Sequence, residues 1–109
     1  MTKEKVEIFY SNIKCLIILF ERCFSLINVQ IPLDVTSISD KAFCKCTSLQ
    51  SITILTGASF IGSHAFNGCS KLKEFEIPKK LFSIENETFA NCVSLKTIEI
   101  PENVITIDD

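Results

Sequence analysis

Six cysteines are the side chains of this 109-residue sequence with the widest chemical potential. In a short secreted chain they would suggest a disulfide framework. Four of them, however, follow one another at a constant spacing of 23 positions: Cys23, Cys46, Cys69 and Cys92. Such a column predicts reduced, buried thiols that stack as small apolar side chains. Disulfides between neighbours in the column are geometrically conceivable, but in-register side chains reach the required dihedral angle only with strain.

The other candidates for chemistry are isolated in the sequence. Cys44 and Cys46 are too close for the usual zinc spacing and lack a second pair, and Cys44 is expected to face outward where Cys46 faces inward. His64, the only histidine, is expected on the solvated surface with no nucleophile beside it. The sequence contains neither a glycine-rich phosphate loop nor a Gly-x-Ser-x-Gly elbow. We therefore predict no enzyme activity, no metal site and no cofactor.

One modification motif is present, the N-glycosylation sequon Asn86-Glu87-Thr88. Thr88 stands 23 positions after Ala65, in a column of small residues that is expected to be buried. Asn86 stands in a column of residues that can cap a helix. Because both side chains have a structural role in this frame, we expect the sequon to be structural rather than a glycan site.

The elements that would hold these residues repeat with the same 23-residue period. A fixed period of roughly 20 to 50 residues indicates a repeat array, in which each unit buries its apolar side against its neighbours. The recurring apolar positions are Phe20, Phe43, Phe66 and Phe89, then Leu26, Leu49, Leu72 and Leu95, then Val29, Ile52, Phe75 and Ile98, then Ile31, Ile54, Ile77 and Ile100, and finally Ile38, Ile61, Ile84 and Ile107.

Each repeat contains the signals of two elements. Apolar and polar residues alternate in Ser51-Ile52-Thr53-Ile54, which predicts a short strand with one buried face. A second apolar pair follows and is expected to line the opposite wall of the coil. Asp40, Ser63 and Asn86 are then expected to cap a short helical turn that contains the sequence Ala-Phe-x-x-Cys or its equivalent.

These motifs resemble the 23-residue repeat of the BspA-like leucine-rich repeats. The resemblance covers residues 20–107 and is carried by Ile61-Gly62-Ser63-His64-Ala65-Phe66-Asn67-Gly68-Cys69 and by Leu72-x-x-Phe75-x-Ile77-Pro78. It implies a right-handed leucine-rich-repeat solenoid (an α/β repeat) with short parallel strands on one face and short helical or 3-10 turns on the other. The family is linked with surface proteins of host-associated bacteria and parasitic protists, and with adhesion and protein binding without catalysis.

The period divides the chain into about four and a half repeats within a single domain, 1–109. Val6 and Ile8 fall in the strand columns and Cys15 in the later isoleucine column, so the first repeat is degenerate. The apolar run Cys15–Phe20 could also be a short signal-peptide core, but Glu21 and Arg22 follow it where small residues should mark cleavage. The expected units are 1–23 (degenerate), 24–46, 47–69 and 70–92 (full), and 93–109 (partial).

Charge and hydropathy restrict the partner. A net charge of −2 removes the long-range attraction on which nucleic-acid and anionic-membrane binding depend, and the longest apolar run has only six residues, so membrane insertion is not expected. We predict a non-catalytic protein-interaction module that binds through the polar strand face. Its candidate contact residues are Asn28, Gln30, Ser51, Thr53, Glu74, Glu76, Thr97 and Glu99.

An alternative is that the chain is a truncated fragment of a longer repeat array with no independent function. The last repeat stops at Asp109, which aligns with the capping residues, so its coil is expected to be uncapped and to favour self-association. The family resemblance suggests the cell surface, whereas no convincing signal peptide or transmembrane segment accompanies it.

Overall fold

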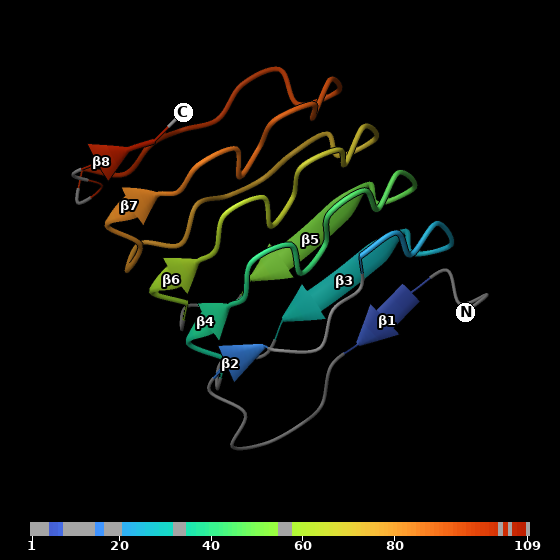
Figure 1. The fold of residues 1–109 in the computed structure, drawn as a ribbon, viewed down its shortest axis with the longest axis horizontal. Helices are drawn as coiled ribbons and strands as arrows, with labels where there is room; N and C mark the ends of the chain where they lie inside the picture. Colours follow the sequence, from blue (N-terminus) through green and yellow to red (C-terminus); the bar gives the residue numbers. More distant parts are fainter. Residues whose placement is uncertain are drawn as a thin grey trace.

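Short parallel strands, stacked one coil above the next, form the framework of the protein (Figure 1). The computed structural model describes residues 21–31, 35–54, 58–102, 104 and 106–108, together with the backbone of residues 5–7 and 15–16. One sheet has the order β1-β3-β5 and a second has the order β2-β4-β6, while β7 pairs with β8. Their bounds are β1 Lys5–Glu7, β2 Cys15–Leu16, β3 Asn28–Ile31, β4 Ser37–Ile38, β5 Ser51–Ile54, β6 Phe60–Ile61, β7 Ser83–Ile84 and β8 Thr106–Ile107.

The strand registers follow the 23-residue period. Val29 lies opposite Ile52 in the first sheet, and Ile38 lies opposite Ile61 in the second. The period holds at the first strand as well, where Val6 lies opposite Val29. Equivalent residues of successive repeats are therefore neighbours in space.

The second strand of the degenerate repeat departs from this register by one residue. The sequence frame places Cys15 opposite Ile38, but the structure pairs Cys15 with Ser37 and Leu16 with Ile38. That expectation is wrong, because paired residues of these two strands are 22 positions apart in the sequence instead of 23. Leu16 therefore occupies the place in the isoleucine column that was expected for Cys15. The related positions Ile8 and Phe20 lie outside the described residues, as does Asp109.

The core is built from the predicted apolar columns. Phe43 and Phe66 are fully buried and their rings stack at a centroid distance of 5.4 Å, while Phe66 and Phe89 stack at 5.9 Å. Phe75 comes from the strand side and meets Phe66 at 5.0 Å in a tilted geometry. The aromatic column thus joins the two walls of three successive coils.

Two predicted core positions of the last repeat are exposed. Ile100 and Ile107 have 46% and 59% of their surface accessible, whereas their counterparts Ile77 and Ile84 are buried. Columns in this fold are covered by the following coil, and no described residue covers the outer side of these two isoleucines. Their prediction as buried residues is therefore wrong.

The segments between the second strand layer and the cysteines form turns, and the expected helical turns do not occur in the described residues. In the turn from Lys41 to Cys46, every second backbone amide donates to a carbonyl of the next coil. Each amide between them donates to the carbonyl three residues earlier in the same turn. An α-helix requires each amide to bond the carbonyl four residues before it, so this division prevents a helix. The inter-coil bonds run from Lys41, Phe43 and Lys45 to the carbonyls of Ser63, Ala65 and Asn67, at 3.0, 2.8 and 2.6 Å.

The turns contain two columns of left-handed backbone, which also differ from the expected helix. Gly68 and Asn91 stand in one column and are residue types that adopt this conformation readily. Other residues in these columns carry a Cβ cost of roughly 1–2 kcal/mol each. The two columns are Lys41, His64 and Glu87, with φ of 62°, 59° and 53°, and Arg22, Lys45, Gly68 and Asn91, with φ of 60°, 60°, 81° and 61°.

The predicted helix caps have a different role. The Asp40 carboxylate accepts a hydrogen bond from the amide of Ser63 in the next coil at 2.9 Å, and the Ser63 hydroxyl donates to the carbonyl of Asn86 at 3.2 Å. With no helix to cap, these polar side chains connect neighbouring coils.

Candidate functional site

The outer side of the first strand layer is the candidate site, and we call it the strand face. Its eight residues come from four successive coils, and β3 and β5 hold the first four in register. Seven of the side chains are exposed and Asn28 is half-buried. The strand face consists of Asn28, Gln30, Ser51, Thr53, Glu74, Glu76, Thr97 and Glu99.

The strand face continues past β5 although residues 72–77 are not in a regular strand. Phe75 and Ile77 are buried, while Glu74 and Glu76 are exposed, so the alternation of inward and outward side chains is kept. The period-two pattern of the sequence therefore predicts the direction of these side chains correctly.

The two halves of the strand face differ in polarity. In the amino-terminal half, the Ser51 hydroxyl donates a hydrogen bond to the Asn28 side-chain oxygen. In the carboxyl-terminal half, Glu74, Glu76 and Glu99 make no side-chain hydrogen bond or ion pair with any described residue. These carboxylates remain available to a partner with basic groups.

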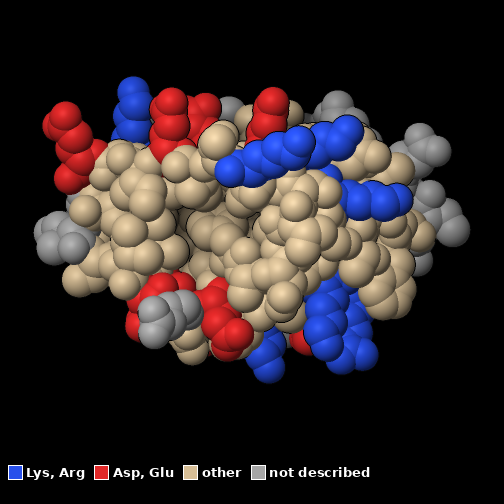
Figure 2. Space-filling view, turned by 90° about the horizontal axis from the view of Figure 1, so that it is seen from above, with Lys and Arg blue, Asp and Glu red and all other residues tan. Residues whose placement is uncertain are grey.

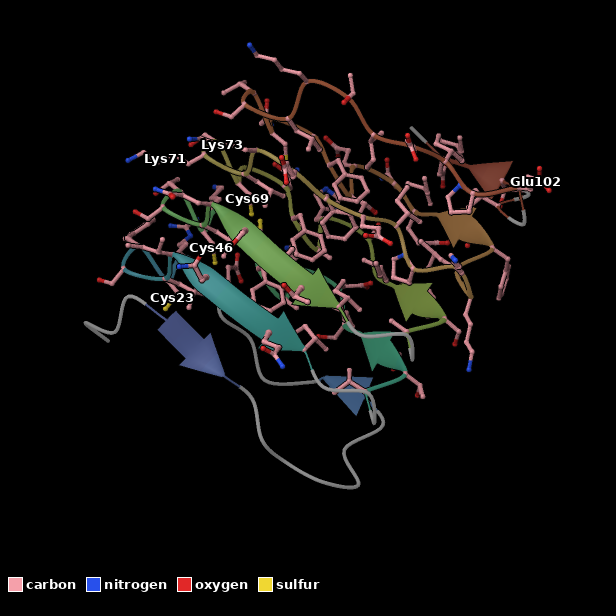
Figure 3. The ribbon with its side chains drawn as sticks, turned by 180° about the vertical axis from the view of Figure 1, so that it is seen from behind. Cys23, Cys46, Cys69, Lys71, Lys73 and Glu102 are labelled. Atoms are coloured by element: carbon pink, nitrogen blue, oxygen red, sulfur yellow. The ribbon has the colours of Figure 1, made fainter. Side chains whose placement is uncertain are left out.

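The periodic cysteines Cys23, Cys46 and Cys69 lie one above another along one edge of the coils (Figure 3). Cys46 and Cys69 are fully buried, Cys92 is buried, and Cys23 is half-buried, so the prediction of burial holds for three of the four. The Cys69 thiol donates to the Phe43 carbonyl at 3.2 Å, and Cys92 repeats this contact with Phe66 at 3.1 Å. None of the described cysteines forms a disulfide.

Burial keeps these thiols protonated. Loss of hydration raises the pKa of Cys46 to about 12 against the opposing effect of a hydrogen bond from the Cys23 backbone. The same cause raises the pKa of Cys92 to about 11 and that of Cys69 further. Cys46, Cys69 and Cys92 are therefore packing residues rather than reactive thiolates.

Cys44 is buried, with only 5% of its surface exposed, and the prediction that it faces outward is wrong. That prediction assumed the alternation of a helical turn, which the hydrogen bonds to the next coil replace. Burial raises the pKa of the Cys44 thiol, and the nearby negative charge of Glu21 raises it further.

We expect the buried thiols to make the fold sensitive to alkaline pH. Below about pH 9 these thiols are protonated in both the folded and the unfolded chain. Above about pH 9 the thiols of the unfolded chain lose protons that the folded chain keeps. The free energy of unfolding therefore falls as the pH rises toward 12. Each thiol contributes a slope of up to about 1.4 kcal/mol per pH unit in this window. Urea unfolding of the wild type and of a Cys46→Ala/Cys69→Ala variant between pH 8 and 11 measures the slopes. Equal slopes would show that the column is not the source.

His64 is more constrained than a solvated surface histidine. Its Nε2 atom lies 2.8 Å from the Glu87 carboxylate, with 29% of the His64 side chain exposed. Both residues have the left-handed backbone conformation and lie in adjacent coils. The contact joins these coils, so His64 lies at the surface as predicted but is half-buried and paired with Glu87.

The sequon residues have the structural environment that the repeat predicts for Thr88. Thr88 is buried, and its hydroxyl donates to the Glu85 carbonyl at 2.9 Å. Asn86 is exposed. In the folded chain the threonine hydroxyl is thus engaged inside the coil.

Two kinds of site are not found in the described part of the chain. Its histidine, cysteine, aspartate and glutamate side chains form no group of three or more that could hold a metal ion. Among the same residues there is also no helix with the length and apolar character needed to cross a membrane.

The 23-residue pattern has counterparts among known proteins. Residues 18–109 match the model of the BspA type leucine rich repeat region, in six copies. The leucine-rich-repeat protein of Treponema pallidum is 36% identical, with a TM-score of 0.72 over 75% of this chain and 41% of its own. No similar sequence was found among curated proteins.

Two further solved structures share the fold at lower identity. A leucine-rich-repeat protein of Bacteroides ovatus is 22% identical, with a TM-score of 0.73 over 96% of this chain and 33% of its own. A leucine-rich cell surface protein of Faecalibacterium prausnitzii is 26% identical, with a TM-score of 0.64 over 98% of this chain and 38% of its own. The chain spans between a third and two fifths of the length of these proteins.

Proposed function

Because the chain belongs to the family of BspA-type leucine-rich repeats, we propose that it is a non-catalytic module that binds another protein through its strand face. Leucine-rich repeats are typical of protein-interaction modules, and stacked repeats provide extended surfaces for partners. The description of the Faecalibacterium protein as a cell surface protein is compatible with a partner met at the cell surface, and we propose adhesion as the role of this binding.

One observation carries this proposal: a row of polar side chains, exposed except for Asn28, stands on a wall that is packed in the coils of β3 and β5. Gln30 and Thr53 are held in register by β3 and β5, and the residues between them and the core are buried. A face fixed in this way loses little conformational entropy when a partner binds, which favours affinity.

Site-specific photocrosslinking tests the proposed face. A photoreactive amino acid is placed at Thr53 or Glu76 on the strand face, and at Thr106 on the other strand layer as the control. All three side chains are exposed, so the replacements should leave the fold intact. The probes are then presented to surface extracts of the source cells and of potential host cells.

We expect the same protein to be crosslinked from Thr53 and Glu76 and not from Thr106. A Glu76→Lys variant should weaken capture of that protein if basic groups of the partner meet the acidic half of the face. Crosslinks from Thr106 alone, or from all three positions equally, would contradict the proposal.

A further inference from the structure

Positive charge gathers on one edge of the protein although the net charge is −2. Seen from above, most Lys and Arg side chains lie at one end of the molecule and most Asp and Glu side chains at the other (Figure 2). Figure 3 shows Lys71 and Lys73 projecting from the fold beside Cys69, and Arg22, Lys45 and Lys96 stand within four residues of the other periodic cysteines in the sequence. We call this the basic edge; it consists of Arg22, Lys45, Lys71, Lys73 and Lys96.

The side chains of the basic edge are exposed and are not neutralised by the fold. None of the five makes a hydrogen bond or ion pair through its side chain with any other residue that the structure describes. Among the described residues, two carboxylates are adjacent to these cations in the sequence: Glu21, next to Arg22, and Glu74, next to Lys73. Five cations against two carboxylates leave this edge positive, in contrast to the chain as a whole.

The repeat spaces these cations along the stacking direction. Arg22 and Lys45 occupy the same position of successive coils, and so do Lys73 and Lys96. The backbone of each turn is bonded to the next, as from the Lys45 amide to the Asn67 carbonyl at 2.6 Å. The two cations of each pair therefore belong to adjacent coils, about 5 Å apart, whereas residues 47–69 between the pairs contain no Lys or Arg.

The backbone at this edge restricts what can bind. The amides of Arg22 and Lys45 are already used in bonds between coils, so a peptide could not add to them as an extra strand. Phe24, 59% exposed, is the one aromatic side chain adjacent to the edge among the described residues. Single-stranded nucleic acids use successive aromatic platforms for their bases, and this edge does not supply them.

We propose that the basic edge binds a linear acidic polysaccharide, whose sulfate or carboxylate groups recur along a stiff chain at about the spacing of the coils. The interaction is made by side chains alone, with the pairs Arg22/Lys45 and Lys73/Lys96 each meeting two successive anions. This site shares no residue with the strand face, although the two surfaces adjoin where Lys73 is followed by Glu74.

Matched pairs of charge removal test the proposal. The Lys71→Gln/Lys73→Gln variant removes two cations of the basic edge, and Lys79→Gln/Lys80→Gln removes two exposed cations elsewhere on the same coil with the same change of net charge. Dextran sulfate and polygalacturonate are the polysaccharide probes, one for each anion type. A thymidine oligonucleotide and poly-glutamate are the other polyanions. Binding is measured by surface plasmon resonance at several salt concentrations, and thermal melting verifies that each variant is folded.

We expect at least one polysaccharide to bind with an affinity that falls as salt rises. The basic-edge variant should bind it about tenfold more weakly, whereas the control variant should change affinity by less than about twofold. The proposal is overturned if neither polysaccharide binds, if both variants lose affinity equally, or if the oligonucleotide or poly-glutamate binds as tightly as the polysaccharides.

Discussion

Replacing Phe66 by alanine is expected to destabilise the protein by about 3–5 kcal/mol, a large part of the stability of a small domain. Phe66 is fully buried and contacts three other rings, stacking on Phe43 and Phe89 and lying tilted against Phe75. The substitution leaves a cavity in the column that joins three coils, and the rigid inter-coil hydrogen bonds limit its collapse. Urea unfolding followed by circular dichroism measures the loss.

Phe82→Ala is the matched control for this substitution. The Phe82 side chain is 56% exposed, so its removal should change the free energy of unfolding by no more than about 0.5 kcal/mol. If the two phenylalanine variants unfolded at similar urea concentrations, the assignment of inward and outward positions would be incorrect.

The free energy of unfolding of the Gly62→Ala variant is expected to be about 1–3 kcal/mol lower than that of the wild type, although the substitution adds only one methyl group. A Cβ at this position would lie 2.5 Å from the Asp40 amide nitrogen and 2.8 Å from its Cα atom. Both are backbone atoms and cannot rotate away, so the two coils must separate. That movement also strains the bond from the Ser63 amide to the Asp40 carboxylate.

Gly68→Asn tests whether this effect is specific to the close approach. Gly68 has a left-handed backbone, and Asn91 holds the same conformation at the equivalent position of the next coil. We expect the asparagine variant to lose no more than about 1 kcal/mol. Thermal melting of the two glycine variants side by side decides the point, and an equal loss would rule out a special role for Gly62.

The apolar columns could be predicted from the sequence because burial in a repeat array recurs with the period. Phe43, Phe66 and Cys69 recur at one spacing, and each is fully buried in the structure. The outward direction of Thr53 and Glu76 follows from strand alternation in the same way. The residues that form each column can therefore be identified from the period alone, without knowing the backbone conformation of the turns between them.

The turns could not be derived as readily, because their hydrogen bonds go to other coils. A helical interpretation of Asp40 to Cys46 considers only local bonds, and it predicts the wrong direction for Cys44. A signal was present, since Gly68 and Asn91 stand 23 positions apart and both residue types favour a left-handed backbone. The basic edge was missed because only the net charge of −2 was taken from the sequence. A net charge does not show that the fold places positive and negative side chains at different ends of the molecule.

Residue-resolved thiol labelling of the native protein tests the central claim, that the 23-residue columns face a closed core and leave the strand face outside. Iodoacetamide labelling followed by peptide mass spectrometry gives a rate for each cysteine. Among the five cysteines whose side chains the structure describes, we predict that the half-buried Cys23 is labelled first, and that Cys44, Cys46, Cys69 and Cys92 are labelled only on unfolding. Rapid labelling of Cys69 in the folded protein, or a disulfide between members of the column, would contradict the account.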